Sequence, residues 1–188
     1  MHDLTPITAL GGTSQRIDTV GDVCLTEMPD VALASVAARR GKEARCRAAL
    51  KPLLNADAPP PGRTTANAPF ESIWTGPDQW MLLADFTTHE DIAAHLKSHL
   101  ADTASVTEQT DAWVCFDLTG PRITAVLELL CTIDLTWFET GDAIRTSIHH
   151  LGCFVICTET GQSVRILGPR ASAGSLHHAI TTAMASAL

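Results

Sequence analysis

The segment from Asp111 to His150 limits the fold of this chain more than any other. Residues 113–118 alternate between apolar and other side chains with a period of two, as expected of a strand with one buried face. The extended pattern begins earlier, near residue 106, and we expect it to bend or bulge near Thr110-Asp111. The segment therefore predicts a strand that contributes to a core.

A helix start follows this strand directly. Thr119-Gly120-Pro121 stops the strand, and Pro121 suits the first helical position because its φ is already helical. The apolar residues that come next recur at i, i+3, i+4 and i+7, which places them on one face of a helix: Ile123, Val126, Leu127 and Leu130. The segment thus predicts a strand, a helix and, from Ala143 to His149, a second strand.

Similar patterns predict the remaining elements. Pro52 disfavours helical backbone at Lys51, so we expect the first helix to end near Leu50. Thr88, with an acidic residue three positions on, predicts the start of a helix that reaches Leu100. The turn Thr75–Gln79, with its proline, predicts a hairpin. The other expected helices are 42–50 and 172–184, and the other expected strands are 17–25, 31–36, 72–74, 80–83, 152–158 and 163–167.

These elements predict an α+β fold. Helix, loop, hairpin and helix occur in that order at 42–100 and again at 121–184, a repeat of pattern rather than of sequence. We expect one domain at 21–188, made of pseudo-repeats at about 21–105 and 106–188, with antiparallel or mixed sheets and helices packed on them. The polar residues 1–20 are expected to form an extended N-terminal arm.

Charge and composition exclude several classes of protein. The net charge of −8 disfavours nucleic-acid binding, because phosphates repel an acidic surface. No run of about 18 apolar residues predicts a membrane span, and the N-terminus lacks the features of a secretory signal. We therefore expect a cytoplasmic protein whose six cysteines are reduced and mostly buried.

Two groups of residues suggest contacts with other molecules. Five basic residues gather at Arg39, Arg40, Lys42, Arg45 and Arg47, which fits either a solvated helix face or a contact for an acidic partner or anionic ligand. The four tryptophans fit either core packing or interface anchors. Among them, Trp137, beside Phe138 in a loop, is expected to form the most exposed aromatic pair.

No catalytic, cofactor-binding or metal-binding set emerges from the residues alone. His149-His150, Cys153 and Cys157 resemble metal ligands, but two cysteines four residues apart on an extended strand lie about 13 Å apart. We therefore favour two core thiols beside a partly buried histidine. Neither a nucleophile elbow nor a phosphate-binding glycine loop is present in the sequence.

A series of motifs runs in order along the chain. They are Ile73-Trp74-x-Gly76-Pro77-Asp78-Gln79-Trp80-x-Leu82-Leu83, Val106-Thr107-x-Gln109-x-Asp111-Ala112-Trp113-Val114, Leu118-x-Gly120-Pro121, Ile133-Asp134-Leu135, Phe138, Gly141, Arg145-Thr146, Pro169-Arg170 and Leu176-His177-His178-Ala179. This series resembles one family, the gamma subunit of heterotetrameric sarcosine oxidase. The match is good over about residues 70–188 and loose before that. It departs from the family at one position, where Arg170-Ala171-Ser172-Ala173 stands in place of the usual Arg-Ser-Phe-Ala.

The resemblance implies a fold and a role. The family is similar in fold to the folate-binding domain of the glycine-cleavage T-protein, an aminomethyltransferase, whose pattern Gly120-Pro121 and Asp134 also match. It implies a complex of alpha, beta, gamma and delta subunits that oxidatively demethylates sarcosine to glycine, passes the one-carbon unit to tetrahydrofolate and forms hydrogen peroxide. FAD, FMN, NAD, tetrahydrofolate and zinc are implied to lie on other subunits, and gamma to be an accessory, non-catalytic subunit packed on alpha.

Two other functions remain open. The chain could be a stand-alone folate-binding protein related to the T-protein, although 188 residues leave no room for the further C-terminal barrel of those enzymes. It could instead be an interaction domain of another complex. For the subunit hypothesis, the candidate interface residues are Trp113, Trp137, Phe138, Arg145, Arg39, Arg40 and Arg170.

Overall fold

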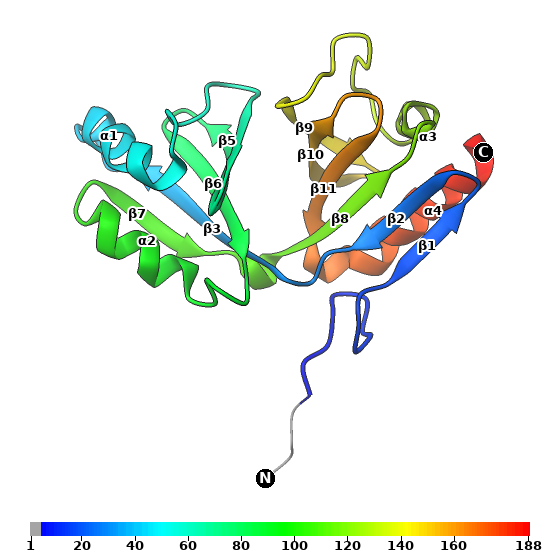
Figure 1. The fold of residues 1–188 in the computed structure, drawn as a ribbon, viewed down its shortest axis with the longest axis horizontal. Helices are drawn as coiled ribbons and strands as arrows, with labels where there is room; N and C mark the ends of the chain where they lie inside the picture. Colours follow the sequence, from blue (N-terminus) through cyan, green and yellow to red (C-terminus); the bar gives the residue numbers. More distant parts are fainter. Residues whose placement is uncertain (1–4) are drawn as a thin grey trace. The chain divides into compact units, whose positions relative to one another are not determined.

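The computed structural model describes residues 5–188, and these residues form two compact units (Figure 1). The first unit joins the N-terminal residues up to Pro29 with Asp111–Thr140 and Ile144–Leu188. The second unit consists of Asp30–Thr110 and the short piece Gly141–Ala143. The chain therefore passes between the units more than once, and each unit is described by itself below.

The first unit contains a sheet and two α-helices. Within residues 5–188, the strands follow the order β1-β2-β8-β11-β10-β9 across the sheet. The elements are β1 (Ile17–Val20), β2 (Val23–Glu27), β8 (Trp113–Thr119), α3 (Ile123–Leu130), β9 (Ala143–Ile148), β10 (Leu151–Glu159), β11 (Ser163–Pro169) and α4 (Ala173–Ala187).

The second unit contains a sheet with the order β4-β5-β6-β3-β7 and again two α-helices. The order β4-β5-β6-β3-β7 corresponds strand by strand to β9-β10-β11-β8-β2 of the first unit. In both sheets, the first helix connects the fourth of these strands to the first, and the second helix follows the third. The elements are β3 (Val31–Ala38), α1 (Glu43–Leu54), β4 (Thr64–Asn67), β5 (Phe70–Gly76), β6 (Gln79–Asp85), α2 (Ile92–Leu100) and β7 (Ala104–Glu108).

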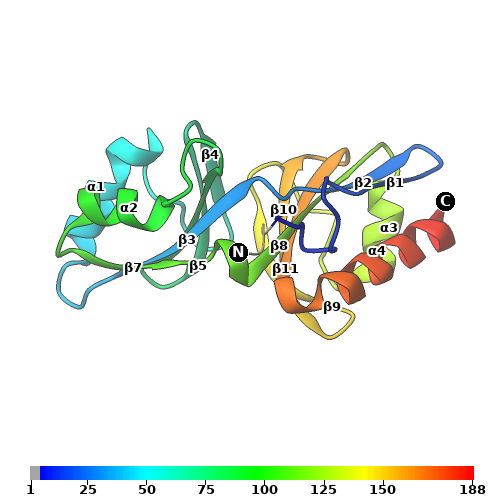
Figure 2. The same cartoon turned by 90° about the horizontal axis from the view of Figure 1, so that it is seen from below.

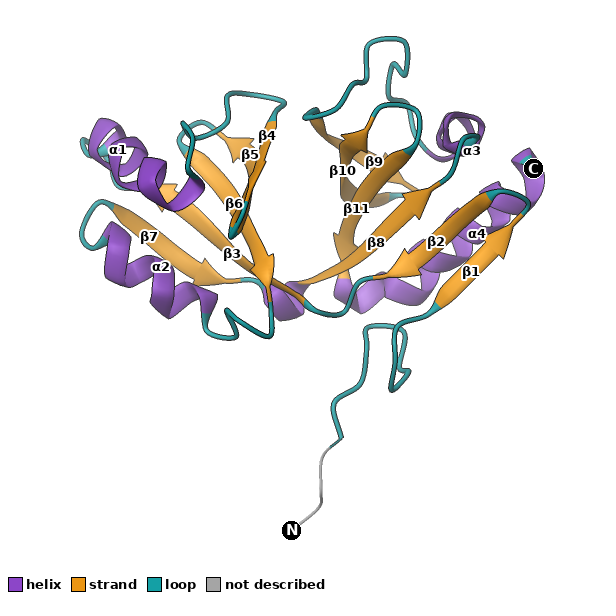
Figure 3. Cartoon of the chain, in the orientation of Figure 1, coloured by secondary structure: helices purple, strands orange, loops and turns teal. Residues whose placement is uncertain are grey.

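Each sheet is antiparallel and packs its helices against one face (Figure 3). In the second unit, the arrangement of β3, α1, β5, β6, α2 and β7 is the split β-α-β pattern. The alternation in β8 places Val114, Phe116 and Leu118 in the core beneath α3 and α4. These two helices contact each other, as Figure 2 also shows. The fold is thus α+β, with two antiparallel sheets and four α-helices in the described residues.

The bend predicted near Thr110-Asp111 is confirmed. A short 3₁₀ turn, Thr110–Ala112, separates β7 from β8, and these two strands belong to different sheets. The predicted strand at 17–25 is instead a hairpin, because Gly21, at φ +58°, turns the chain between β1 and β2. Part of the expected N-terminal arm is therefore strand β1.

The predicted end of the first helix is wrong. Helix α1 continues through Pro52 to Leu54, because Leu53 and Leu54 pack into the core of the second unit. Asn55 then ends the helix in a left-handed conformation, and its side-chain amide donates to the carbonyl of Ala68 at 3.0 Å. Burial of two leucines outweighs the local preference of the proline.

The predicted cap of the next helix is also wrong. Helix α2 begins at Ile92, and the carboxylate of Asp91 accepts a hydrogen bond from the amide of Ala94 at 2.9 Å. Thr88 instead donates its hydroxyl to the carbonyl of Asp85 at 3.2 Å. Strand β4, which is not among the strands expected from the sequence, pairs with β5.

The units differ in their boundaries from the expected pseudo-repeats. Strand β2 lies beside β8 in the first unit, whereas the sequence places it in the N-terminal half. The single domain and its pseudo-repeats stay predictions. No helix within residues 5–188 has both the length and the apolar composition needed to cross a bilayer.

Candidate functional site

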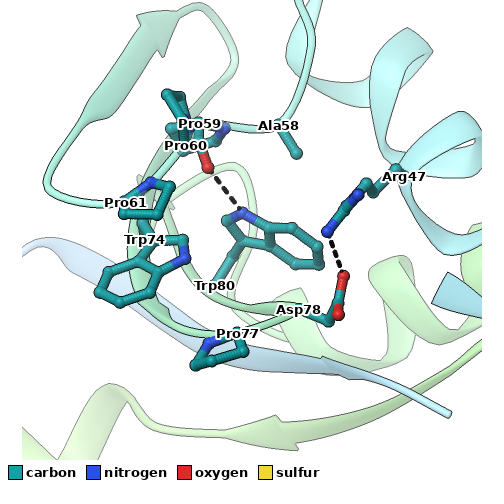
Figure 4. Close-up of a pocket in the computed structure, with 9 residues that line it drawn as sticks. All are labelled: Arg47, Ala58, Pro59, Pro60, Pro61, Trp74, Pro77, Asp78 and Trp80. Atoms are coloured by element: carbon teal, nitrogen blue, oxygen red, sulfur yellow. Dashed lines mark hydrogen bonds and ion pairs between the residues drawn. The ribbon is translucent and has the colours of Figure 1, made fainter. Parts of the chain in front are cut away.

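A hollow of about 480 Å³ in the second unit is walled by aromatic and proline side chains (Figure 4). Trp74 and Trp80 are directly paired across β5 and β6, so both point to the same face of the sheet. Trp80 is only 2% exposed and belongs to the core, whereas Trp74 is half-buried. Pro59, Pro60 and Pro61 of the preceding loop also line the hollow.

Two polar contacts fix the shape of this hollow. The indole Nε1 of Trp80 donates to the carbonyl of Pro59 at 3.1 Å, which ties the proline loop to the sheet. Arg47 of α1 forms an ion pair with Asp78, which lies in the β5–β6 turn at φ +55°. Rigid apolar walls beside one ion pair suit an apolar group with a polar edge.

Two of the predicted interface residues lie against the same ring. Trp113 and Phe154 have ring centroids 5.6 Å apart, and the guanidinium carbon of Arg145 lies 5.6 Å from the centre of the Phe154 ring. Arg145 is exposed, Trp113 is half-buried and Phe154 is buried. The structure therefore gathers Trp113 and Arg145 into one cluster on the first unit.

Trp137 and Phe138 differ from each other. Trp137 is 80% exposed, whereas Phe138 is 7% exposed and belongs to the core of the first unit. The prediction that the two form an exposed pair is wrong for Phe138. This side chain packs into the core of the first unit and fixes the loop there.

The basic cluster lies around the start of α1 in the second unit. Lys42 and Arg45 form ion pairs with Asp102, and Arg47 pairs with Asp78. Arg39 and Arg40 are exposed in the turn between β3 and α1. Three members of the cluster are thus engaged within the unit, which leaves these two arginines as its outward part.

Arg170 lies in the first unit beside the N-terminal segment. Its guanidinium is 3.9 Å from a carboxylate oxygen of Asp111 and donates to the carbonyl of Ile7 at 3.4 Å. Its neighbours therefore include the segment that the sequence predicts to be an arm. The interface roles of all seven candidate residues stay predictions.

The cysteines and the adjacent histidines are not brought together as a set. His149 and His150 form the exposed β9–β10 turn, whereas Cys153 and Cys157 are buried in the core of the first unit. Burial raises the pKa of the Cys153 thiol to about 11, so this thiol stays protonated near neutral pH. Within residues 5–188, no three His, Cys, Asp or Glu side chains are placed to share a metal ion.

Three hydrogen bonds that the sequence did not predict hold the N-terminal residues of the first unit. Nε2 of the buried His177 on α4 donates to a carboxylate oxygen of Asp18 on β1 at 2.7 Å. The buried carboxylate of Glu27 accepts from the amide of Leu10 at 3.0 Å and of Arg16 at 3.3 Å. No local pattern could reveal a pair 159 residues apart.

Comparison with known proteins finds structural relatives. No protein-family model and no curated protein matches the sequence of this chain. A chain of the heterotetrameric sarcosine oxidase from Corynebacterium sp. U-96 is similar with a TM-score of 0.76 and 24% identity, over 89% of this chain and 87% of that chain. The glycine cleavage system aminomethyltransferase T from Bartonella henselae is similar with a TM-score of 0.60 and 16% identity, over 85% of this chain and 45% of that chain.

These two likenesses concern the fold. Identities of 24% and 16% are low, but the similarity extends over most of this chain in both cases. The predicted relation to the T-protein fold is confirmed at this level. The chain therefore has the fold shared by a chain of a heterotetrameric sarcosine oxidase and part of an aminomethyltransferase.

Proposed function

We propose that this chain is the gamma subunit, an accessory and non-catalytic one, of a heterotetrameric sarcosine oxidase. The observation that carries the proposal is the fold match to one chain of such an oxidase, which spans 87% of that chain. The match to the aminomethyltransferase spans only 45% of that larger enzyme. The likeness to the oxidase chain is also the stronger of the two, with a TM-score of 0.76 against 0.60.

The proposed complex oxidatively demethylates sarcosine to glycine, transfers the one-carbon unit to tetrahydrofolate and forms hydrogen peroxide. FAD, FMN, NAD, tetrahydrofolate and zinc are proposed to lie on the alpha, beta and delta subunits. This chain supports assembly by packing on the alpha subunit. We propose a cytoplasmic location for the complex.

The chemistry of the surface supports a role in contacts. Trp137 and Arg145 are exposed, and Arg39 and Arg40 extend the basic cluster outward. Tryptophan and arginine are enriched among the residues that dominate binding energy in protein interfaces. Phe138 would then act by holding the Trp137 loop in place.

Co-expression tests the proposal. The chain is produced with tagged alpha, beta and delta subunits of sarcosine oxidase from the same organism, and the tagged complex is sized. We expect all four chains in one peak that oxidises sarcosine. A chain that elutes alone, while the other three assemble and remain active, would contradict the proposal.

Arg145→Ala provides a narrower test. Arg145 is exposed and lies over the face of the Phe154 ring. The substitution should therefore reduce the yield of the complex clearly, and it should lower the melting temperature of the lone chain only slightly. An unchanged yield with a lowered melting temperature would assign Arg145 to folding instead.

A stand-alone folate-binding protein is the second candidate, and the likeness to the aminomethyltransferase favours it. Calorimetry of the isolated chain with tetrahydrofolate separates the two. Micromolar binding by the lone chain would support this second candidate, and no binding would leave the subunit proposal in place. An interaction domain of a different complex is the alternative if neither test succeeds.

A further inference from the structure

Trp137 is the most exposed of the large apolar side chains in residues 5–188. It is 80% exposed, in the connection between α3 and β9 (yellow-green to yellow in Figure 1). A free tryptophan on a surface leaves a large apolar area in water, and such area marks contact sites when it is held in a fixed place.

The loop holds Trp137 in a fixed place. On one side, Leu135 is partly buried against the core of the first unit, and on the other side Phe138 is buried in it. Thr140 and Thr160 each donate a backbone amide to the hydroxyl of the other at 2.9 Å. A fixed side chain loses little conformational freedom when a partner covers it, so more of its burial energy remains for binding.

The chain segment that carries Trp137 is acidic. Residues 123–141 contain Glu128, Asp134 and Glu139 and no lysine or arginine. A hollow of about 390 Å³ between α3 and the loop is lined by residues that include Glu128 and Asp134. Both carboxylates belong to exposed residues. Negative charge disfavours nucleic acid and anionic lipid as partners, and it favours a basic protein surface.

We propose that Trp137, with the carboxylates of Glu128 and Asp134, is a docking surface for a protein whose apolar pocket is bordered by lysine or arginine. Trp137 fills the pocket, and a basic side chain of the partner enters the hollow beside α3. This inference rests on the proposed function, so the partner is another subunit of the same complex.

The test measures the affinity of purified variants of this chain for a complex of the alpha, beta and delta subunits. Trp137→Ala removes the anchor. Glu128→Gln with Asp134→Asn removes both charges but keeps an acceptor for the amide of Thr136, which Asp134 binds at 3.1 Å. Ile17→Ala is the control, because Ile17 is an exposed apolar residue on β1 of the same unit. The melting temperature of each variant is recorded.

We expect Trp137→Ala to bind about tenfold more weakly or worse. The double variant should bind several-fold more weakly at low salt and show a smaller salt dependence than the unmodified chain. Ile17→Ala should bind as the unmodified chain does. If Trp137→Ala lowers the melting temperature, the double variant carries the test alone.

Two failures are distinguishable. If the unmodified chain binds the three subunits and both the Trp137 and the double variants bind equally well, the docking surface is wrong and the subunit proposal stands. If the unmodified chain does not bind them, the subunit proposal fails and this inference fails with it.

Discussion

The two units arrange five strands in the same order but draw them from the chain differently. In the second unit, the strands and helices come from the continuous stretch Asp30–Thr110. In the first unit, β8 lies between β11 and β2, and β2 comes from near the N-terminus. The place of β2 is taken in the second unit by β7, which follows the second helix of that unit. One sheet is therefore local in sequence and the other depends on a distant strand.

The difference shows which contacts a discontinuous sheet requires. The first unit ties its N-terminal hairpin in place with the Asp18–His177 hydrogen bond and the close approach of Gly120 to Asp22. The second unit instead ties a loop to its own sheet through Trp80 and Pro59. Substitutions at these contacts should affect the units in different ways.

Gly120→Ala should have the largest effect. Gly120 lies at φ +134°, and a Cβ there would be 2.2 Å from the carbonyl oxygen of Asp22, so the two strands would have to separate. We expect a loss of about 4 kcal/mol or more in the free energy of unfolding, measured with urea.

Gly161→Ala is the matched control for this substitution. Gly161 also has positive φ, at +68°, but no heavy atom lies within 4 Å of a Cβ built there. It should cost only about 1–2 kcal/mol, the expense of the left-handed conformation. Equal losses for the two variants would show that the approach to Asp22 does not constrain the first unit.

Leu118→Ala and Leu82→Ala test whether the units unfold together. Each leucine is fully buried, one in the core of the first unit and one in that of the second, so each substitution should cost about 3 kcal/mol. We expect a single unfolding transition, shifted by either variant, because the chain crosses between the units after Pro29, Thr110, Thr140 and Ala143. Calorimetry that shows two transitions, each shifted by one variant, would replace the predicted single domain with two.

Trp80→Phe should have a smaller effect, confined to the second unit. An aromatic side chain remains, but the phenyl ring is smaller than the buried indole and the carbonyl of Pro59 loses its hydrogen bond from Nε1, which together should cost about 1–3 kcal/mol. Trp74→Phe, on the paired strand, serves as the control and should change stability by less than about 0.5 kcal/mol. If thermal melts showed a larger loss of stability for Trp74→Phe than for Trp80→Phe, the hydrogen bond from Trp80 would not hold the proline loop.

Asp18→Asn should have the smallest effect, and one that depends on pH. The hydrogen bond from Arg16, with a further contribution from His177, holds the pKa of Asp18 below its usual range. A carboxyl group with a lowered folded pKa stabilises the fold above its unfolded pKa, about 3.9, and loses this effect as the pH falls through the folded value. We expect a loss of about 1 kcal/mol near pH 6 that becomes smaller as the pH falls below about 3.9.

Asp57→Asn, which removes a carboxylate from an exposed pair with Lys51, is the control for the pH series. It should change stability very little at any pH. If the difference between Asp18→Asn and the unmodified chain were the same at pH 3 and pH 6, the charge of Asp18 would not contribute to the stability of the first unit.

Local patterns predicted the elements that depend on nearby residues. The hairpin around Pro77 and the strand and helix around Gly120-Pro121 are present, because turn geometry and apolar periodicity are properties of short segments. The helix through Pro52 was missed because distant core packing overrides local preference there. The place of β2 beside β8 was missed for the same kind of reason, since only a tertiary contact reveals it.

The candidate site was less accessible to sequence reasoning. The exposure of Trp137 followed from its place in a loop, but the burial of Phe138 did not, because one loop can present one side chain and bury its neighbour. The bond between Trp80 and Pro59 joins residues 21 positions apart through a proline loop whose path the sequence does not specify. The sequence thus predicted the exposure of Trp137, but it did not predict the burial of Phe138 or the hydrogen bond of Trp80.

The most direct measurement is the composition of the complex after co-expression with tagged alpha, beta and delta subunits, determined by size-exclusion chromatography with mass detection. We expect one species that contains this chain in equal amount to the other three and that contains less of it when Trp137 is replaced by alanine. A three-subunit complex without this chain, at the same yield and activity, would contradict the proposal that the chain is a subunit.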